Sequence, residues 1–195
     1  MFPKMITRRG LLAGTAALTA SAAASPLLAE TLDPNSVRSQ DSVRRNTSSF
    51  ESQDWRDHFD TLGKATIVCD TVSRALHFWS GDGSTYKVYP TSVPLTDEMK
   101  RTGYTKIVRK RVGPDWTPTA SMKKRDPNLH YMPPGPDNPL GTHAMYLSWP
   151  AYLIHGTHDT RKIGRRSSSG CIGTYNELIA ELFELTPVGT QVRVI

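Results

Sequence analysis

The chain contains 195 residues, of which 37% are hydrophobic and 22% are charged, and its formal net charge is +6. This length and composition are typical of a soluble protein with one compact domain and short extensions. Three basic residues, Lys4, Arg8 and Arg9, lie in the first 29 residues, which contain no acidic residue, so the rest of the chain carries about +3. So small an excess argues against a nucleic-acid partner.

Residues 1–29 have the layout of a secretory signal peptide. A basic start is followed by an apolar, alanine-rich stretch and then by small residues, and the weak hydrophobicity argues against a stable membrane span. The adjacent Arg8 and Arg9 resemble a twin-arginine export signal, although such pairs also occur in ordinary secretory signals. Cleavage after Ala24 and cleavage after Ala29 both remain open. We therefore expect a bacterial protein of the periplasm or cell envelope, exported by the twin-arginine route.

The basic residues that remain are clustered. The clusters are Arg109-Lys110-Arg111, Lys123-Lys124-Arg125, Arg161-Lys162 and Arg165-Arg166. In an exported protein they favour a carboxylate-bearing or polyanionic polymer of the envelope, and the alternative is that they lie on solvated loops.

Residues 30–58 are polar and predict an arm or linker with a short helix near Trp55–Phe59. After it, short apolar or β-branched runs predict strands at 65–69, 75–79, 85–89, 105–112, 144–149, 152–154 and 190–195. Residues 113–142 are rich in Pro, Gly, Asp and Asn and predict a long loop, which is usually functional or mobile.

One helix is predicted from Thr174 onwards. Thr174 followed three residues later by Glu177 has the form of a capping box, and Leu178, Ile179, Leu182, Phe183 and Leu185 recur at helical spacing before Pro187. The pattern indicates a mainly β domain with one or two helices.

Cys171 allows three interpretations: a buried packing residue, a disulfide with Cys69, or a nucleophile. It lies three residues before the expected helix start, where the partial positive charge of the helix end lowers the pKa of a thiol. The small residues of Ser168-Ser169-Gly170 could turn amide groups toward an oxyanion. His155 ends an apolar strand before a glycine and is the best candidate base, and His158 could line the same site.

His155-Gly156-Thr157, followed by Ser168-x-Gly170-Cys171-Ile172, resembles the signature of the L,D-transpeptidase catalytic domain (YkuD-like) family. The segments Asn138–Gly141, Asn176 and Pro187–Thr190 agree in order. The resemblance covers roughly residues 60–195 and implies a catalytic domain at 59–195, mainly β, with a sandwich-like or barrel-like sheet on which one or two helices pack.

The resemblance also implies the chemistry. Cys171 would attack a peptidoglycan tetrapeptide stem and form a thioester, and His155 would act as base and then as acid. A backbone carbonyl near Gly156 would orient the imidazole, Ser168 would hydrogen-bond within the site, and the amides of Gly170 and Cys171 would form the oxyanion hole. No cofactor or metal is implied. The acceptor would be a second stem, a protein amine, a D-amino acid or water.

Two positions depart from the family pattern. Gly173 stands where many members carry an arginine that helps to hold the substrate, and Ser169 stands where many carry histidine. The candidate substrate-binding residues are Ser169, Arg165, Arg166, His158 and Asn176, and either arginine is near enough in sequence to replace the missing charge. The alternatives are a carboxypeptidase or endopeptidase that hydrolyses the same bonds, and a non-catalytic peptidoglycan-binding module.

Overall fold

The computed structural model describes residues 51–195. The predicted signal peptide and the first part of the predicted arm therefore lie outside the described residues. Within the remainder of the arm, the 3-10 helix η1 (Trp55–Asp57) agrees with the short helix expected there. The side chain of Asp54 caps it by accepting a hydrogen bond from the N–H of Arg56 at 2.9 Å.

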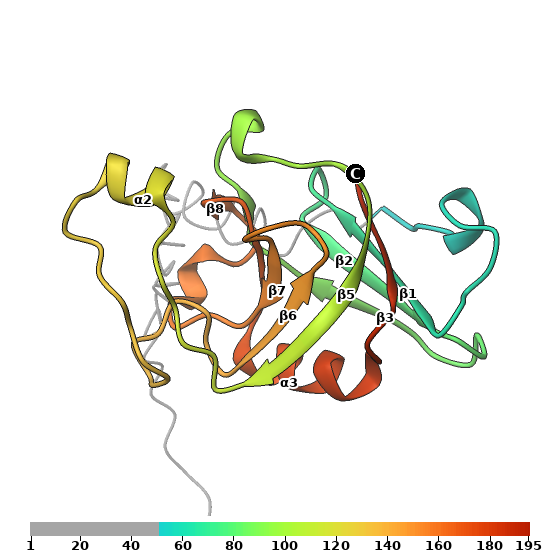
Figure 1. Ribbon diagram of the computed structural model, residues 1–195. Helices are drawn as coiled ribbons and strands as arrows, with labels where there is room; N and C mark the ends of the chain where they lie inside the picture. Colours follow the sequence, from blue (N-terminus) through green and yellow to red (C-terminus); the bar gives the residue numbers. More distant parts are fainter. Residues whose placement is uncertain (1–50) are drawn as a thin grey trace, which may run out of the picture. The chain divides into compact units, whose positions relative to one another are not determined.

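The domain is built on one eight-stranded sheet with the order β3-β2-β1-β10-β5-β6-β7-β9 (Figure 1). Its strands are β1 (Ala65–Asp70), β2 (Ala75–Ser80), β3 (Tyr86–Pro90), β5 (Gly103–Val112), β6 (His143–Leu147), β7 (Leu153–His155), β9 (Ile172–Gly173) and β10 (Gln191–Val194). A second, two-stranded sheet pairs β4 (Val93–Pro94) with β8 (Arg166–Ser168) in parallel. Two further 3-10 helices are η2 (Asp97–Met99) and η3 (Thr160–Lys162).

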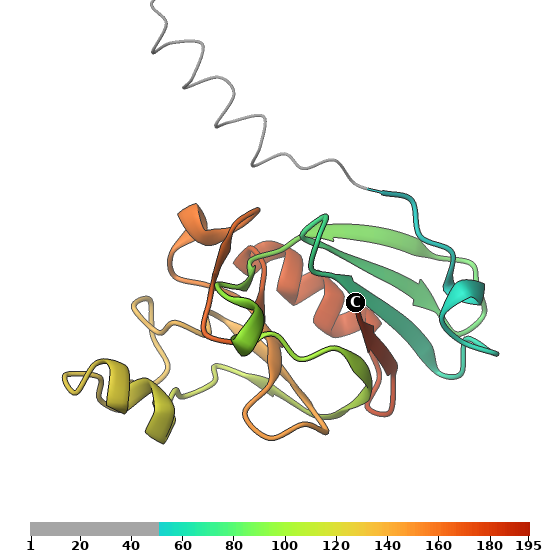
Figure 2. The ribbon, with the colours of Figure 1, turned by 90° about the horizontal axis from the view of Figure 1, so that it is seen from above.

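The sheet curls so that its two ends share one hydrophobic core. Ile67 and Phe78, from β1 and β2, belong to the same buried cluster as Met145 and Ile154, from β6 and β7. The helix α3 (Asn176–Leu185) lies against the sheet (Figures 1 and 2). Its buried side chains Ile179, Leu182 and Phe183 belong to the same core cluster. The prediction of a mainly β domain with helices packed on it is confirmed.

The long segment between β5 and β6 contains a second, short helix, α2 (Ala120–Arg125), which stands on the side of the domain away from β1–β3 in both views (Figures 1 and 2). The buried Asn138 organises this segment. Its side-chain amide donates to the carbonyl oxygens of Pro114, Met132 and Pro133 at 2.9–3.2 Å, and its Oδ1 accepts from the N–H of Leu140. The segment is therefore tied together by one buried side chain although it is rich in Pro and Gly.

The predicted capping box at Thr174 is wrong. The N-cap of α3 is Tyr175, which makes no side-chain cap, and the helix begins at Asn176. Thr174 is fully buried and its hydroxyl donates to the carbonyl of Pro90 at 2.8 Å, while its N–H donates to the carbonyl of His155 at 2.9 Å. The bond from the Thr174 N–H continues the pairing between β7 and β9, and the backbone is still extended at Tyr175, so the helix cannot begin at Thr174.

Candidate active site

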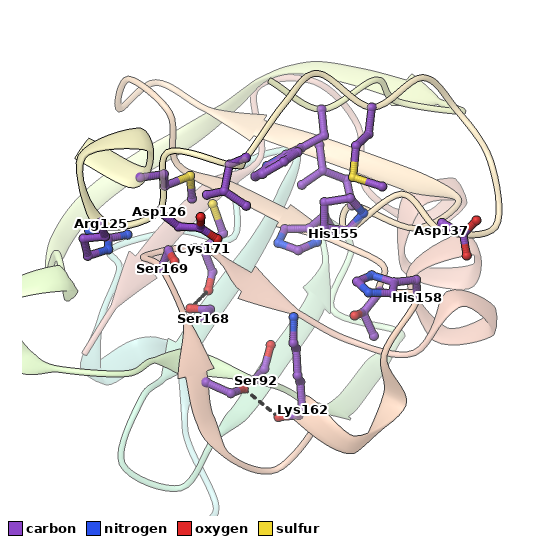
Figure 3. A pocket seen from close by; sticks show the side chains of 18 residues that line it. Ser92, Arg125, Asp126, Asp137, His155, His158, Lys162, Ser168, Ser169 and Cys171 are labelled. Atoms are coloured by element: carbon purple, nitrogen blue, oxygen red, sulfur yellow. Dashed lines mark hydrogen bonds between the residues drawn. The ribbon is translucent and has the colours of Figure 1, made fainter. Parts of the chain in front are cut away.

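The pairing of β7 with β9 brings His155 and Cys171 to one face of the sheet. The two strands are parallel, with Ile154 opposite Ile172 and His155 opposite Gly173. Successive side chains of a strand point to opposite faces. Ile154 and Ile172 are in the core, so His155 and the residue before Ile172, Cys171, project the other way. Both side chains line one pocket of about 480 Å³ (Figure 3).

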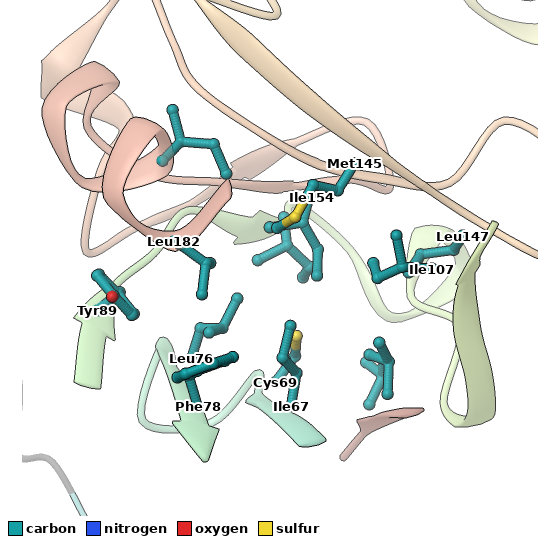
Figure 4. Packing of buried hydrophobic residues seen from close by; sticks show 14 of the residues in the cluster. Ile67, Cys69, Leu76, Phe78, Tyr89, Ile107, Met145, Leu147, Ile154 and Leu182 are labelled. Carbon is teal, nitrogen blue, oxygen red and sulfur yellow. The ribbon is translucent and has the colours of Figure 1, made fainter. Parts of the chain in front are cut away.

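The hydrophobic core of the domain includes the second cysteine. Cys69 is 1% exposed among the hydrophobic side chains of β1, β2 and β6, and Ile154 lies in the same cluster (Figure 4). Both cysteines are free, so the alternative of a disulfide between them is wrong. Burial raises the pKa of the Cys69 thiol far above its ordinary value. Cys69 is therefore a packing residue.

A backbone carbonyl orients the imidazole of His155. Nδ1 lies 2.5 Å from the carbonyl oxygen of Gly156, which can only accept a hydrogen bond, so Nδ1 carries the proton. This fixes the tautomer and leaves Nε2 as an acceptor. Burial lowers the pKa of His155 to about 4, and the charge of Lys162 adds to this effect. The ring is therefore neutral at pH 7 and able to take a proton.

The Cys171 thiol rests on apolar side chains. It packs against the small cluster of Leu140, Ala144 and Leu153, and Sγ lies 3.6 Å from the carbonyl oxygen of Ala151. Burial raises the pKa of Cys171 to about 11. The expectation that a helix end lowers this pKa is wrong, because β9 lies between Cys171 and the start of α3. The resting pair is a thiol and a neutral imidazole.

A tight turn precedes the cysteine. Ser168 Oγ donates to the carbonyl of Cys171 at 2.6 Å and accepts from the N–H of Gly170 at 3.3 Å. Gly170 has φ of +134°, a backbone conformation that side chains disfavour. Since the Gly170 amide is already bonded to Ser168, the Cys171 amide is the better placed of the two for an oxyanion.

Asn176 holds the two glycine-containing segments beside the pocket. Its Oδ1 accepts hydrogen bonds from the N–H groups of Thr142 and Thr157, each at 3.2 Å. A Cβ added at Gly141 would lie 2.1 Å from this oxygen, and one at Gly156 would lie 2.3 Å from it. Both positions therefore require glycine. Asn176 does not line the pocket, so it is not placed for the substrate contact that the sequence predicts.

The remaining expected binding residues divide into two groups. Ser169 and His158 line the pocket with Cys171. Arg165 and Arg166 do not, and Arg166 instead donates to Asp97 at 2.8 Å and to the carbonyl of Pro94. The pocket cations are Lys162, from η3, and Arg125, from α2 (Figure 3). In the sequence both cations stand out only as members of basic clusters, and no sequence pattern points to Ser92, Asp126 and Asp137, which also line the pocket.

Gly173 is explained by the residue packed against it. Ser92 forms an isolated bridge with Gly173, with the N–H of Ser92 donating to the Gly173 carbonyl at 2.7 Å. A Cβ at position 173 would lie 2.5 Å from Ser92 Oγ and 3.7 Å from Cε1 of His155. The serine side chain therefore fills the space where an arginine side chain would begin.

An oriented histidine and a cysteine on the same face of paired strands have the arrangement that nucleophilic catalysis by cysteine requires. Residues 64–194 match the family model of the L,D-transpeptidase catalytic domain. The chain therefore belongs to this family, whose named members are enzymes of the acyltransferase type. Among residues 51–195, no helix is long and apolar enough to cross a bilayer.

Individual relatives agree with this assignment. A protein of Fuscovulum blasticum, provisionally named an L,D-transpeptidase in the ATP synthase subunits region, is 58% identical over 97% of this chain and 98% of its own length. ErfK/SrfK of Escherichia coli K12, named a probable L,D-transpeptidase, is 38% identical over 70% of this chain, but the chain spans only 45% of that protein.

The solved structures support the fold. An L,D-transpeptidase from Mycobacterium smegmatis superimposes with a TM-score of 0.55 at 18% identity, over 68% of this chain and 58% of that one. The Enterococcus faecium L,D-transpeptidase C442S mutant superimposes with a TM-score of 0.52 at 19% identity, over 69% of this chain and 50% of that one.

Proposed function

We propose that this protein is a cysteine-dependent L,D-transpeptidase that acts on peptidoglycan tetrapeptide stems. Sγ of Cys171 attacks the carbonyl carbon of the third stem residue, and the C–N bond to the terminal D-alanine breaks. The thiol proton passes through Nε2 of His155 to the leaving amine, and a thioester remains on Cys171. An acceptor amine then attacks the thioester, gives its proton to His155 and regenerates the thiol.

The observation that carries this proposal is the shared face of β7 and β9, from which the oriented imidazole and the thiol enter one pocket. With pKa values of about 4 for His155 and about 11 for Cys171, the proton is on sulfur at neutral pH. The imidazole must therefore remove it as the attack proceeds, which is general-base catalysis. The Cys171 amide is the proposed donor to the oxyanion of the tetrahedral intermediate.

We also propose the cellular setting. The features of residues 1–29 fit export by the twin-arginine route to the periplasm or cell envelope, where peptidoglycan stems are present. The products that remain possible by chemistry are a 3→3 cross-link, attachment of a protein amine, exchange of a D-amino acid and hydrolysis.

Covalent labelling with a carbapenem tests the nucleophile. We expect one adduct per chain by mass spectrometry, lost in Cys171→Ala and retained in Cys69→Ala. The second variant is the matched control because it removes the other free cysteine. A wild-type protein with reduced thiols that forms no adduct would exclude a reactive Cys171 and favour the binding-module alternative.

Incubation with purified disaccharide tetrapeptide tests the reaction. Cross-linked dimers that have lost one D-alanine are the expected product, and His155→Ala should lower the rate of their formation by roughly 10²–10⁴-fold, the usual contribution of a general base. Shortened monomers without dimers would instead identify a carboxypeptidase. Unchanged activity in His155→Ala would show that another group acts as the base.

A further inference from the structure

Lys162 places an unpaired ammonium in the pocket. Its backbone is fixed, because its N–H donates to the carbonyl of Asp159 at 3.2 Å and its carbonyl accepts from Ser167 Oγ at 3.0 Å. Among residues 51–195 no carboxylate forms an ion pair with its side chain, which is partly buried and lines the pocket with Cys171 and His155 (Figure 3).

The neighbouring residue explains why this ammonium has no partner. Arg161 takes the carboxylate of Asp159 in a bidentate contact, from Nε at 2.8 Å and from Nη2 at 3.0 Å. The Arg161 side chain is 86% exposed, whereas the side chain of Asp159 is only 17% exposed. The nearest acidic residue in sequence thus forms its side-chain hydrogen bonds with Arg161, and Lys162 interacts with it only through a weaker charge attraction.

Lys162 lines the pocket beside which a side chain at position 173 would begin. Ser92 also lines the pocket, and its hydroxyl occupies the space where a side chain at position 173 would begin. Lys162 and His155 line the same pocket (Figure 3), and the charge of Lys162 adds to the burial that lowers the pKa of His155. The cation therefore shares this pocket with the base that exchanges a proton with the amine.

We propose that Lys162 binds a carboxylate that is attached to the same carbon as the reacting amine. It binds this group first in the leaving D-alanine and then in the acceptor. This inference rests on the proposed function. In the leaving D-alanine the amine and the carboxylate are attached to the same carbon, so the carboxylate carbon lies two bonds from the nitrogen that His155 protonates. A charge-assisted hydrogen bond from the ammonium to this carboxylate positions that nitrogen.

The same contact selects the acceptor. A free D-amino acid carries an amine and a carboxylate on one carbon. The diamino acid of a second stem also does so, provided that the carboxylate beside its free amine is not blocked. A lysine side chain of a protein carries its amine on a methylene group, and water carries no carboxylate. Lys162 therefore favours cross-linking between stems and D-amino-acid exchange over protein attachment and hydrolysis.

Carboxylate binding also acts on the base. The ammonium of Lys162 opposes a second positive charge on His155, and a bound carboxylate neutralises this repulsion. The imidazole therefore becomes a better proton acceptor when the substrate occupies the pocket than when the pocket is empty.

Exchange kinetics with paired acceptors test the proposal. The acceptors are D-methionine and D-methioninamide, which differ in the carboxylate, and the measured quantity is the ratio of their kcat/KM values. Comparing this ratio between variants cancels the different basicity of the two amines. Lys162→Ala should lower the ratio about tenfold or more, mainly through the KM of D-methionine, and Lys162→Arg should restore much of it.

A control variant separates this effect from general loss of charge. Lys124→Ala removes an exposed lysine that does not line the pocket, and it should keep the wild-type ratio. A Lys162→Ala variant that cross-links stems with an unchanged ratio would overturn the inference and leave the proposed function in place.

Binding to the inactive Cys171→Ala protein gives a readout that needs no turnover. Calorimetry compares a tetrapeptide stem with the same peptide whose terminal carboxyl group is an amide. We expect tighter binding of the free acid, and loss of this preference in Cys171→Ala/Lys162→Ala. A wild-type protein that turns over no stem, together with this carboxylate preference, would overturn the proposed function and leave only carboxylate binding by Lys162. Equal affinities in both proteins would overturn the inference.

Discussion

Replacing Asn176 by alanine separates a structural role from a substrate contact. The change removes the oxygen that accepts from the N–H groups of Thr142 and Thr157. Thr142 is exposed, so water can replace its partner, but Thr157 is only 4% exposed and its N–H is left unpaired. A buried unpaired donor costs about 1–3 kcal/mol. Alanine favours the helix by less than about 1 kcal/mol, which offsets only part of this.

We therefore expect Asn176→Ala to lose about 1–2 kcal/mol of stability, which corresponds to a fall in Tm of roughly 2–8 °C for a domain of this size. Activity should fall through kcat, because Thr157 adjoins the Gly156 carbonyl that orients His155. Differential scanning calorimetry and steady-state kinetics measure the two effects. Asn176→Asp is the matched control, since it keeps an acceptor oxygen in the first turn of α3, where a negative charge is favourable. An unchanged Tm with a raised KM would refute this reasoning and show that Asn176 contacts the substrate.

Three other outcomes follow from the site. Gly173→Arg should lower Tm because of the 2.5 Å approach to Ser92 Oγ, and adding Ser92→Gly should recover part of the loss; equal Tm values for the single and double variants would contradict this. Alkylation of Cys171 by iodoacetamide should keep accelerating with pH toward about 11, whereas a plateau from about pH 5 would indicate a thiolate–imidazolium pair. His155 has a folded-state pKa of about 4, below its ordinary 6.5, so the unfolded chain binds the extra proton between these values. Stability measured by urea unfolding should therefore fall as the pH drops from 6.5 to 4, and less steeply in His155→Gln.

The strands could be predicted because their side chains alternate or are continuously apolar. β1 and β2 were recognised from short β-branched and aromatic runs, and both are almost wholly buried. His155 and Cys171 could be predicted because their spacing and neighbours resemble a family signature. Their placement in one pocket depends on the parallel pairing of β7 and β9, a long-range feature that no local pattern encodes.

The predictions that were wrong concern polar side chains. Their hydrogen-bond partners are set by the three-dimensional fold and not by neighbouring residues. Thr174 and Glu177 satisfy the capping pattern, but the hydroxyl of Thr174 bonds to Pro90, 84 residues away. Arg165 and Arg166 are closer to Cys171 in sequence than Lys162 is. β8 nevertheless pairs with β4, and the Arg166 side chain reaches Asp97 on η2. Sequence distance alone could not rank these cations.

The glycine at position 173 and the lysine at position 162 are best understood together. A side chain at position 173 would begin beside His155 and collide with Ser92. A cation in this pocket must therefore come from another element of the fold. The turn η3 provides one, because Asp159 holds Arg161 outward while the next residue enters the pocket. Lys162 has a single flexible ammonium where an arginine would give a planar pair of donors. We therefore expect this site to tolerate carboxylates at more than one angle, as successive binding of a leaving residue and a bulkier acceptor requires.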